Sequence, residues 1–136
     1  MPKVDRKILS IKAEVVENLK KIIKAENVLD HEDQIRPFET DALSAYKQKP
    51  LVVVFPENTK EVSKILTYCN RERIKVVPRG AGTGLSGGSL PLEDGILLCL
   101  GKFNKIINID YQNRCVVAQP GVTNLAITQA VEDKGF

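Results

Sequence analysis

The sequence predicts an α+β fold, and three observations lead to that prediction. Apolar runs of strand length occur at 51–55, 74–77 and 95–100, and two further strand-like runs follow at 106–110 and 114–118. Apolar residues at helical spacing occur before, between and after these runs. The last three strands have no helix between them, so the chain lacks the regular alternation of an α/β fold.

The first 49 residues are predicted to form an N-terminal helix and a connecting segment. Helical spacing runs from about Ser10 to Ala25, and lysines occupy the last turns, where the helix dipole favours cations. From Asn27 to Lys49 the polarity is mixed and interrupted by Pro37, which predicts an irregular stretch with at most a short helical turn near 41–46. The inner face of the helix is expected to consist of Ile11, Val15, Leu19, Ile22 and Ile23.

A strand, a helix and a second strand are predicted next. The run 51–55 is continuously apolar and stops at a proline, which is typical of a strand covered on both faces. Asn58 can cap the helix, with Glu61 three residues later. We expect this helix to end near Arg71 and the second strand to cover 74–77. The inward stripe of the helix is expected to be Val62, Ile65, Leu66 and Cys69.

Three more strands and a helix complete the prediction. The third strand covers 95–100, and the runs 106–110 and 114–118 are expected to form a hairpin joined by a polar three-residue turn. Thr123 can cap a final helix, and Gly135 marks its end.

Composition argues against several classes of function. With 136 residues, 43% of them hydrophobic, the chain has the size and composition of one globular domain. A net charge of +3, with three tyrosines, four phenylalanines and no tryptophan, disfavours nucleic-acid binding. No segment resembles a signal peptide or a membrane span, so we expect a cytoplasmic protein without a transmembrane segment.

The cysteines and the histidine do not indicate a metal site. Cys69, Cys99 and Cys115 have no C-x-x-C spacing and lie in or beside apolar residues, so we expect buried, reduced thiols. His31 stands beside two acidic residues but lacks a second His or Cys at ligand spacing, which predicts a surface histidine.

The most informative feature is a glycine-rich segment that follows the second predicted strand. Five of the nine glycines lie between Gly80 and Gly88. Such a segment costs conformational entropy on folding, which indicates a compensating reason such as close approach of backbone to a ligand. Its backbone N–H groups can form a nest for a phosphate, and Arg79 adds a positive charge. Hydroxyl donors occur at Thr83, Ser86 and Ser89.

Two alternatives stay open for this segment. A flexible Gly/Ser connector has a similar composition and needs no ligand. For Arg79, the alternative to phosphate binding is an ion pair with a carboxylate at the surface.

Two common phosphate-binding motifs do not fit the segment. A Walker A motif requires a lysine after its second glycine, but Gly88 follows Gly87 here. The spacing from Gly82 to Gly87 matches a Rossmann G-x-G-x-x-G, yet the residues 88–91 that follow cannot begin a regular helix. A nucleoside triphosphatase and a standard NAD-binding domain are therefore disfavoured.

Several segments together resemble a known flavoprotein family. The segment 77–88, flanked by 50–56 and 117–122, is similar to the FAD-linked oxidases of the vanillyl-alcohol oxidase type. Within this family it most resembles the glycolate oxidase FAD-binding subunit and the D-lactate dehydrogenases. The resemblance includes 35–39 and 41–46, so it covers the chain from about residue 30 onward.

The resemblance implies a fold and a cofactor. In that fold, residues 1–49 would form an N-terminal helical segment. Residues 50–136 would form the first α/β subdomain of a PCMH-type FAD-binding domain, which is truncated relative to family members. Some relatives attach the flavin through a histidine at the position of Thr83, so we expect non-covalent FAD. The residues expected at the FAD pyrophosphate are Pro78, Arg79, Gly80, Ala81, Gly82, Thr83, Gly84, Ser86, Gly87 and Gly88, with Pro120 and Gly121 as a second backbone segment near the cofactor.

The resemblance also implies an activity, the oxidation of a 2-hydroxy acid such as glycolate or D-lactate. In this family the flavin accepts the hydride, and the protein orients the substrate and supplies a base. No residue of this sequence is identified as that base, so no catalytic residue is assigned. We expect either self-association or a partner chain that supplies the missing half. The alternative function is a non-catalytic remnant or module that binds a nucleotide-like anion or a protein partner.

Overall fold

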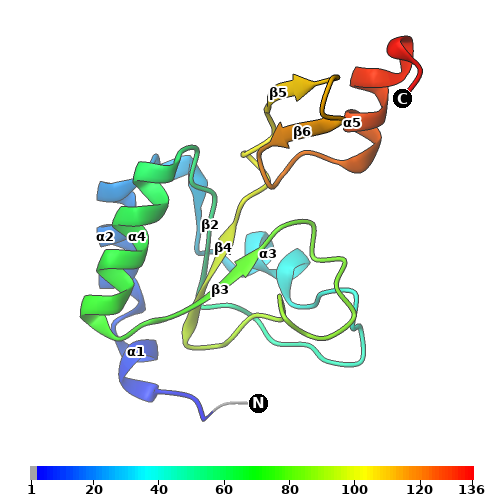
Figure 1. Cartoon of the computed structure of the whole chain (residues 1–136). Coiled ribbons are helices and arrows are strands. Elements are labelled where there is room, and N and C mark those ends of the chain that lie inside the picture. The colour runs from blue at the N-terminus through cyan, green and yellow to red at the C-terminus, as the bar shows by residue number, and fades with distance from the viewer. Residues whose placement is uncertain (1–2) are drawn as a thin grey trace.

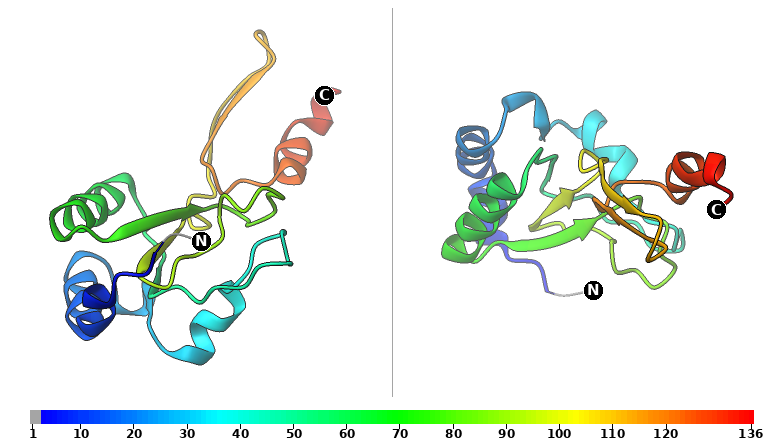
Figure 2. Two further views of the ribbon diagram at one scale, coloured as in Figure 1. Left: turned by 90° about the horizontal axis from the view of Figure 1, so that it is seen from below. Right: turned by 45° about the horizontal axis from the view of Figure 1, so that its top comes forward.

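The computed structural model describes residues 3–136 and has two parts (Figure 1). A four-stranded sheet carries α2 and α4 on one face and α3 on the other, and a hairpin with α5 extends away from it (Figure 2). The helices are α1 (Arg6–Ser10), α2 (Lys12–Ile22), α3 (Glu32–Ile35), α4 (Thr59–Glu72) and α5 (Asn124–Val131), with 3-10 turns at Ala25–Asn27, Arg36–Phe38 and Glu132–Lys134. The strands are β1 (Val28–Leu29), β2 (Val52–Val54), β3 (Lys75–Arg79), β4 (Gly95–Cys99), β5 (Ile106–Asp110) and β6 (Cys115–Ala118).

The order of strands in the main sheet is β1-β2-β4-β3. β2, β4 and β3 are parallel, and β1 pairs with β2 in the antiparallel direction. Helix α4 connects β2 to β3, while β4 lies between them. The carboxyl ends of the three parallel strands therefore meet at one edge of the sheet, where open α/β sheets bind their ligands.

Alternate side chains of β2 pack on opposite faces of the sheet. Val52 and Val54 belong to the apolar cluster formed with α2 and α4, whereas Val53 packs with Ile35 of α3. All residues of β4 are buried as well. The predicted strand with cover on both faces is confirmed, as is the α+β fold.

The predicted N-terminal helix is confirmed, with an interruption at Ile11 that separates α1 from α2. The prediction for 27–49 is wrong in part, because this segment contributes β1, which pairs Val28 with Val54, and α3, which buries Ile35. A two-residue strand and a four-residue helix are too short to show a periodic pattern, so only tertiary pairing reveals them.

Helix α4 begins as predicted. The Asn58 side-chain oxygen accepts a hydrogen bond from the Glu61 N–H at 3.0 Å. The expected place of Leu66 in the inward stripe is wrong, because this side chain is 44% exposed, whereas Tyr68 is only 6% exposed. Successive helical residues are about 100° apart, so a stripe centred between Ile65 and Tyr68 leaves Leu66 facing outward.

A polar cluster at the end of β2 joins three parts of the chain. Glu57 Oε1 accepts hydrogen bonds from Asn27 Nδ2 at 3.1 Å and from Lys102 Nζ at 3.0 Å. Its Oε2 pairs with Lys24 Nζ at 2.9 Å. These hydrogen bonds lower the pKa of Glu57 to about 2, and the one from Lys24 has the largest effect.

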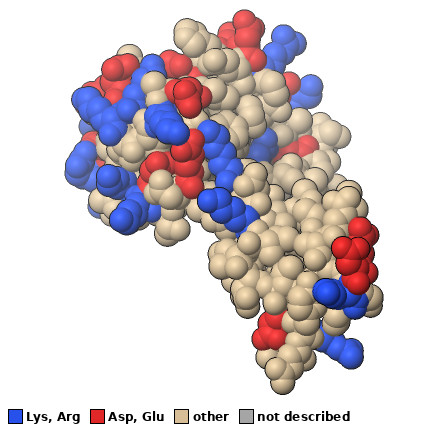
Figure 3. All heavy atoms as spheres, turned by 90° about the horizontal axis from the view of Figure 1, so that it is seen from above, with Lys and Arg blue, Asp and Glu red and all other residues tan. Residues whose placement is uncertain are grey.

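The C-terminal unit of β5, β6 and α5 lacks a buried core. Within 104–136, all of which the structure describes, no residue is buried. Ile107 and Leu125 are each 65% exposed, and the surface of this unit carries few charged side chains (Figure 3). The expectation of a buried thiol is confirmed for Cys69 and Cys99 but is wrong for Cys115, because the residues of β6 alternate between exposed and half-buried and Cys115 is one of the exposed ones.

No helix in the described part of the chain is both long enough and apolar enough to cross a membrane.

Replacing Glu57 by Gln is expected to lower the stability of the protein near neutral pH and to have no effect near pH 2. The pKa of Glu57 falls from 4.5 to about 2 on folding, so its stabilisation is complete above pH 4.5 and is lost as the pH drops toward 2. Urea unfolding across this pH range measures the difference. Glu132→Gln is the control, because Glu132 is exposed and forms no ion pair with any residue from 3 to 136. If Glu57→Gln changed the free energy of unfolding by the same amount at every pH, the prediction would be contradicted.

The exposed apolar side chains of the C-terminal unit predict self-association of the isolated chain. Light scattering at increasing concentration should give a mass above the 15.1 kDa of one chain. Ile107→Lys combined with Leu125→Glu should shift the mass toward a monomer, whereas Leu66→Glu, at an exposed position on α4, should not. A monodisperse wild-type monomer would rule out this behaviour.

Candidate functional site

A cleft of about 370 Å³ lies at the carboxyl ends of the parallel strands. Phe55, Arg79 and Cys99 contribute the ends of β2, β3 and β4, and the start of the glycine segment forms one wall. The segment that follows α3 forms the opposite wall, with Phe38 packed edge-on against Phe55 at 5.8 Å between ring centroids. The cleft therefore occupies the edge of the sheet where ligands of open α/β sheets bind.

The Arg79 side chain holds the glycine segment in place through hydrogen bonds. Its side chain is 6% exposed, and its guanidinium donates hydrogen bonds to the carbonyl oxygens of Phe38 (3.3 Å), Thr40 (2.7 Å) and Ser89 (2.9 Å). Its buried Nε has no hydrogen-bond partner among the described residues. The alternative of a surface ion pair is wrong, because the side chain is buried and its partners are carbonyl groups.

Gly82 packs directly on the Arg79 guanidinium. A β-carbon at Gly82 would lie 3.4 Å from Arg79 Nε, and the glycine has φ +73°, which side chains rarely adopt. Its carbonyl accepts a hydrogen bond from the Ala42 N–H at 2.9 Å. The conformation of Gly82 thus joins the glycine segment to 38–43.

Asp41 is a functional candidate that sequence reasoning missed. It is 7% exposed and accepts a hydrogen bond from the Leu43 N–H at 2.9 Å, with the Ser89 hydroxyl 3.4 Å from its other oxygen. The resemblance included 41–46, but nothing in the local pattern showed that this segment folds over the glycine segment. We assign Asp41 a positioning role, because its carboxylate holds the turn that faces Ser89.

The glycine segment presents free hydrogen-bond donors. No backbone N–H from Gly80 through Ser89 donates to another group among residues 3–136. Most of this segment is exposed, and it contains no carboxylate. Successive unpaired N–H groups in a loop without a carboxylate of its own are the donors from which anion sites are built.

Three glycines of the segment have no intramolecular reason to be glycine. A β-carbon at Gly80, Gly84 or Gly88 would meet no atom within 4 Å, and none of these residues has a positive φ. Gly87, by contrast, has φ +71°. Side chains at these three positions would fill the open space beside the backbone. With glycine there, a ligand can approach the backbone closely.

The remaining predicted site residues lie in two places. Pro78 lies in β3 and is exposed at the edge of the sheet, where its missing N–H breaks no ladder. Gly121 is packed against the turn after β4, since a β-carbon there would lie 2.8 Å from the carbonyl oxygen of Phe103 and 2.9 Å from that of Leu100. Pro120 borders a separate cleft with Leu100, so the structure gives Gly121 a packing role and leaves its approach to a cofactor a prediction.

Other chemistry-bearing side chains near the cleft are unreactive or distant. Burial raises the pKa of the Cys99 thiol to about 11, against the opposite effect of the Arg79 charge, so this thiol is neutral at physiological pH. His31 is exposed and does not line the cleft. No group of three or more His, Cys, Asp or Glu side chains in the described residues could hold a metal ion.

Comparisons with known proteins show which family the chain resembles over most of its length. The FAD binding domain family matches residues 50–136. The glycolate oxidase subunit GlcD of Escherichia coli K12 is 46% identical over 131 residues, which is 96% of this chain and 25% of the relative. A probable mitochondrial D-2-hydroxyglutarate dehydrogenase of Oryza sativa subsp. indica is 38% identical over 121 residues, 89% of this chain and 22% of the relative. The chain thus spans about a quarter of the length of these curated relatives.

Solved structures agree on the fold. The 4-ethylphenol oxidase of Gulosibacter chungangensis superimposes with a TM-score of 0.82 at 26% identity, over 97% of this chain and 26% of that one. A p-cresol methylhydroxylase with bound substrate gives a TM-score of 0.74 at 20% identity, over 96% of this chain and 26% of that one. The expectation of a vanillyl-alcohol-oxidase-type, PCMH-type fold is confirmed.

Gly121→Ala is expected to destabilise the protein by roughly 1–3 kcal/mol, because the new methyl group would overlap three backbone carbonyl oxygens that cannot easily move. Gly84→Ala, which meets open space at an ordinary φ, should change stability by no more than about 0.5 kcal/mol. Urea unfolding of the two variants measures both values, and similar stabilities would show that the turn after β4 adjusts freely.

Proposed function

Because the chain belongs to the FAD binding domain family over residues 50–136, we propose that its glycine segment, Gly80–Ser89, binds the pyrophosphate of FAD without a covalent bond. Backbone N–H groups of the segment would donate to the phosphate oxygens, and the Arg79 charge below the loop would favour the anion. In this proposal Arg79 holds the loop in place through carbonyl groups rather than through the phosphates.

One observation carries the proposal, the open space at Gly80, Gly84 and Gly88. The fold by itself tolerates a side chain at each of these positions, since no atom lies within 4 Å of a β-carbon there. Glycine loses the most conformational freedom on folding, so three such residues in one loop favour close contact with a bound ligand. A flexible connector explains the composition but not the anchored conformation around Gly82.

Two features support a non-covalent mode of binding. Thr83 occupies the exposed centre of the loop, and a neutral hydroxyl is a weak nucleophile. His31, the one histidine of the chain, does not line the cleft.

We further propose that the chain is the FAD-binding portion of an oxidoreductase that acts on a 2-hydroxy acid such as glycolate or D-lactate. Its curated relatives include a glycolate oxidase subunit and a probable D-2-hydroxyglutarate dehydrogenase. Bound FAD supplies a hydride acceptor for such a substrate. The residues of this chain bind and orient the cofactor, and the base that takes the hydroxyl proton would come from another segment or a partner chain, since the one carboxylate that lines this cleft, Asp41, already accepts hydrogen bonds from the Leu43 N–H and the Ser89 hydroxyl.

Gly84→Val is the decisive test of the proposed site. It should leave the unfolding free energy nearly unchanged and weaken FAD binding by at least about tenfold, because the branched side chain fills the space that the pyrophosphate needs. Quenching of FAD fluorescence on titration with the chain, and the visible absorption of the complex, give the affinity.

Ala45→Val is the matched control, because Ala45 is exposed in a turn and does not line the cleft. Its FAD affinity should equal that of the wild type. Equal FAD affinity of Gly84→Val and the wild type would refute the assignment of the loop, and absence of binding by the wild-type chain at millimolar FAD would refute unaided binding.

A further inference from the structure

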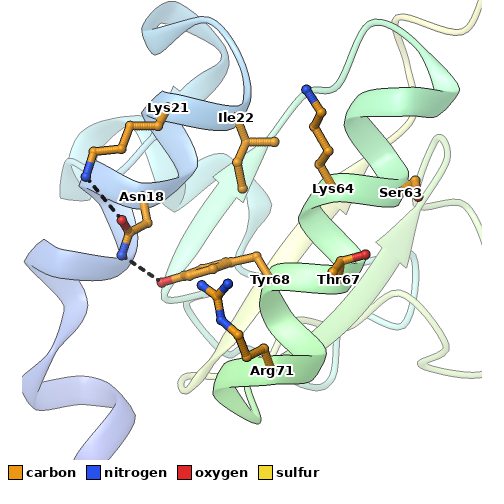
Figure 4. A pocket seen from close by; sticks show the side chains of 8 residues that line it. All are labelled: Asn18, Lys21, Ile22, Ser63, Lys64, Thr67, Tyr68 and Arg71. Carbon is orange, nitrogen blue, oxygen red and sulfur yellow. Dashed lines mark hydrogen bonds between the residues drawn. The ribbon is translucent and has the colours of Figure 1, made fainter.

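A second hollow, separate from the FAD cleft, lies between α2 and α4 on the face of the sheet opposite α3 (Figure 4). It is a groove of about 360 Å³ whose floor contains Tyr68 and Ile22. The buried ring of Tyr68 connects the two helices, and its hydroxyl accepts a hydrogen bond from Asn18 Nδ2 at 3.5 Å. None of the residues that line this α2–α4 groove lines the FAD cleft.

Cations line the groove, and no acidic residue does. Lys21 comes from α2, and Lys64 and Arg71 come from α4. Figure 3 shows Lys and Arg side chains gathered over this part of the molecule, with acidic residues among them but outside the groove lining. The groove lining therefore carries three positive charges and no negative one.

The cations of the groove are available to an external ligand. Within residues 3–136, Lys64 forms no hydrogen bond or ion pair, and Lys21 Nζ donates only to Asn18 Oδ1 at 3.3 Å. Arg71 pairs through Nε with Glu72 at 2.7 Å and lies 5.6 Å from the centroid of the Tyr68 ring. This stacking holds the Arg71 guanidinium over the Tyr68 ring and leaves its terminal N–H groups free to donate.

The donor set favours carboxylates on a polypeptide. The neutral lining groups include the Ser63 and Thr67 hydroxyls, which can bridge between the charged donors and peptide carbonyls. Small-molecule sites are mostly apolar and enclosed, whereas this groove is open to solvent and has charged and hydroxyl-bearing side chains in its lining. Tyr and Arg are the residue types that most often anchor protein interfaces, and a single aromatic residue offers too little stacking surface for nucleic acid.

We propose that the α2–α4 groove is a docking site for an acidic segment of a protein partner, whose Asp or Glu carboxylates pair with Lys21, Lys64 and Arg71. Charge complementarity identifies the occupant, because the groove offers donors and positive charge and contains no acceptor carboxylate. The site is separate from the proposed FAD site, since the groove and the FAD cleft share no lining residue.

A fluorescein-labelled peptide of alternating Glu and Gly tests the proposal, with the same peptide carrying Gln in place of Glu as the neutral probe. Fluorescence anisotropy with the full chain should show binding of the acidic peptide that weakens with salt, and little binding of the Gln peptide. Amide chemical shifts should change in α2 and α4 and remain constant in the glycine segment.

The variant that tests the residues is Lys21→Glu combined with Lys64→Glu, which should weaken binding by about tenfold or more. Lys105→Glu combined with Lys134→Glu changes the net charge equally at exposed positions outside the groove and should change the affinity by less than about twofold. Unchanged circular dichroism and melting temperature of both variants exclude unfolding as the cause.

Four outcomes would overturn the proposal. These are no binding of the acidic peptide, an equal loss in the two charge-matched variants, equal binding of the Gln peptide, and competition by inorganic phosphate at constant ionic strength that reveals a site for small anions. Because FAD is absent from these measurements, their failure would leave the glycine-segment assignment untouched.

Discussion

The hydrogen bonds of Arg79 hold together the part of the structure on which the candidate site depends. Strands β3 and β4 are parallel neighbours, yet the chain between them contains no helix to bridge the crossover. The buried guanidinium instead connects the carbonyl groups of Phe38 and Thr40 to that of Ser89. Charge-assisted hydrogen bonds of this kind are strong, and together they fix both ends of the glycine segment.

The choice of carbonyl groups as partners has an electrostatic consequence. A carboxylate partner would neutralise Arg79, whereas the carbonyl groups accept hydrogen bonds from its two terminal nitrogens and leave its charge. Because the Arg79 side chain is buried, its charge acts on the cleft with little screening by solvent. One arginine therefore holds the geometry of the loop and, in the proposed site, also adds a positive charge that favours the anion.

The glycines of the segment serve two different purposes. Gly82 and Gly87 have positive φ, so the backbone path itself requires them. A β-carbon at Gly80, Gly84 or Gly88 would meet no atom within 4 Å, so the fold does not require glycine there, and in the proposed site this space is left for the ligand. The loop is consequently shaped before binding, which reduces the conformational entropy that a ligand must offset.

Much of the fold and of the site could be predicted from local sequence. The apolar run 51–55, the Asn58 cap and the glycine-rich segment each depend on neighbouring residues, and period, capping and turn chemistry are local properties. Tertiary structure alone decided the insertion of β4 between β2 and β3 and the outward position of Leu66. It also decided that Arg79 lies beneath the loop, because that requires contact with residues about 40 positions earlier in the chain. The sequence by itself determined a glycine-rich loop that follows a strand, because composition and turn chemistry are local, and packing between distant segments determined what holds that loop in shape.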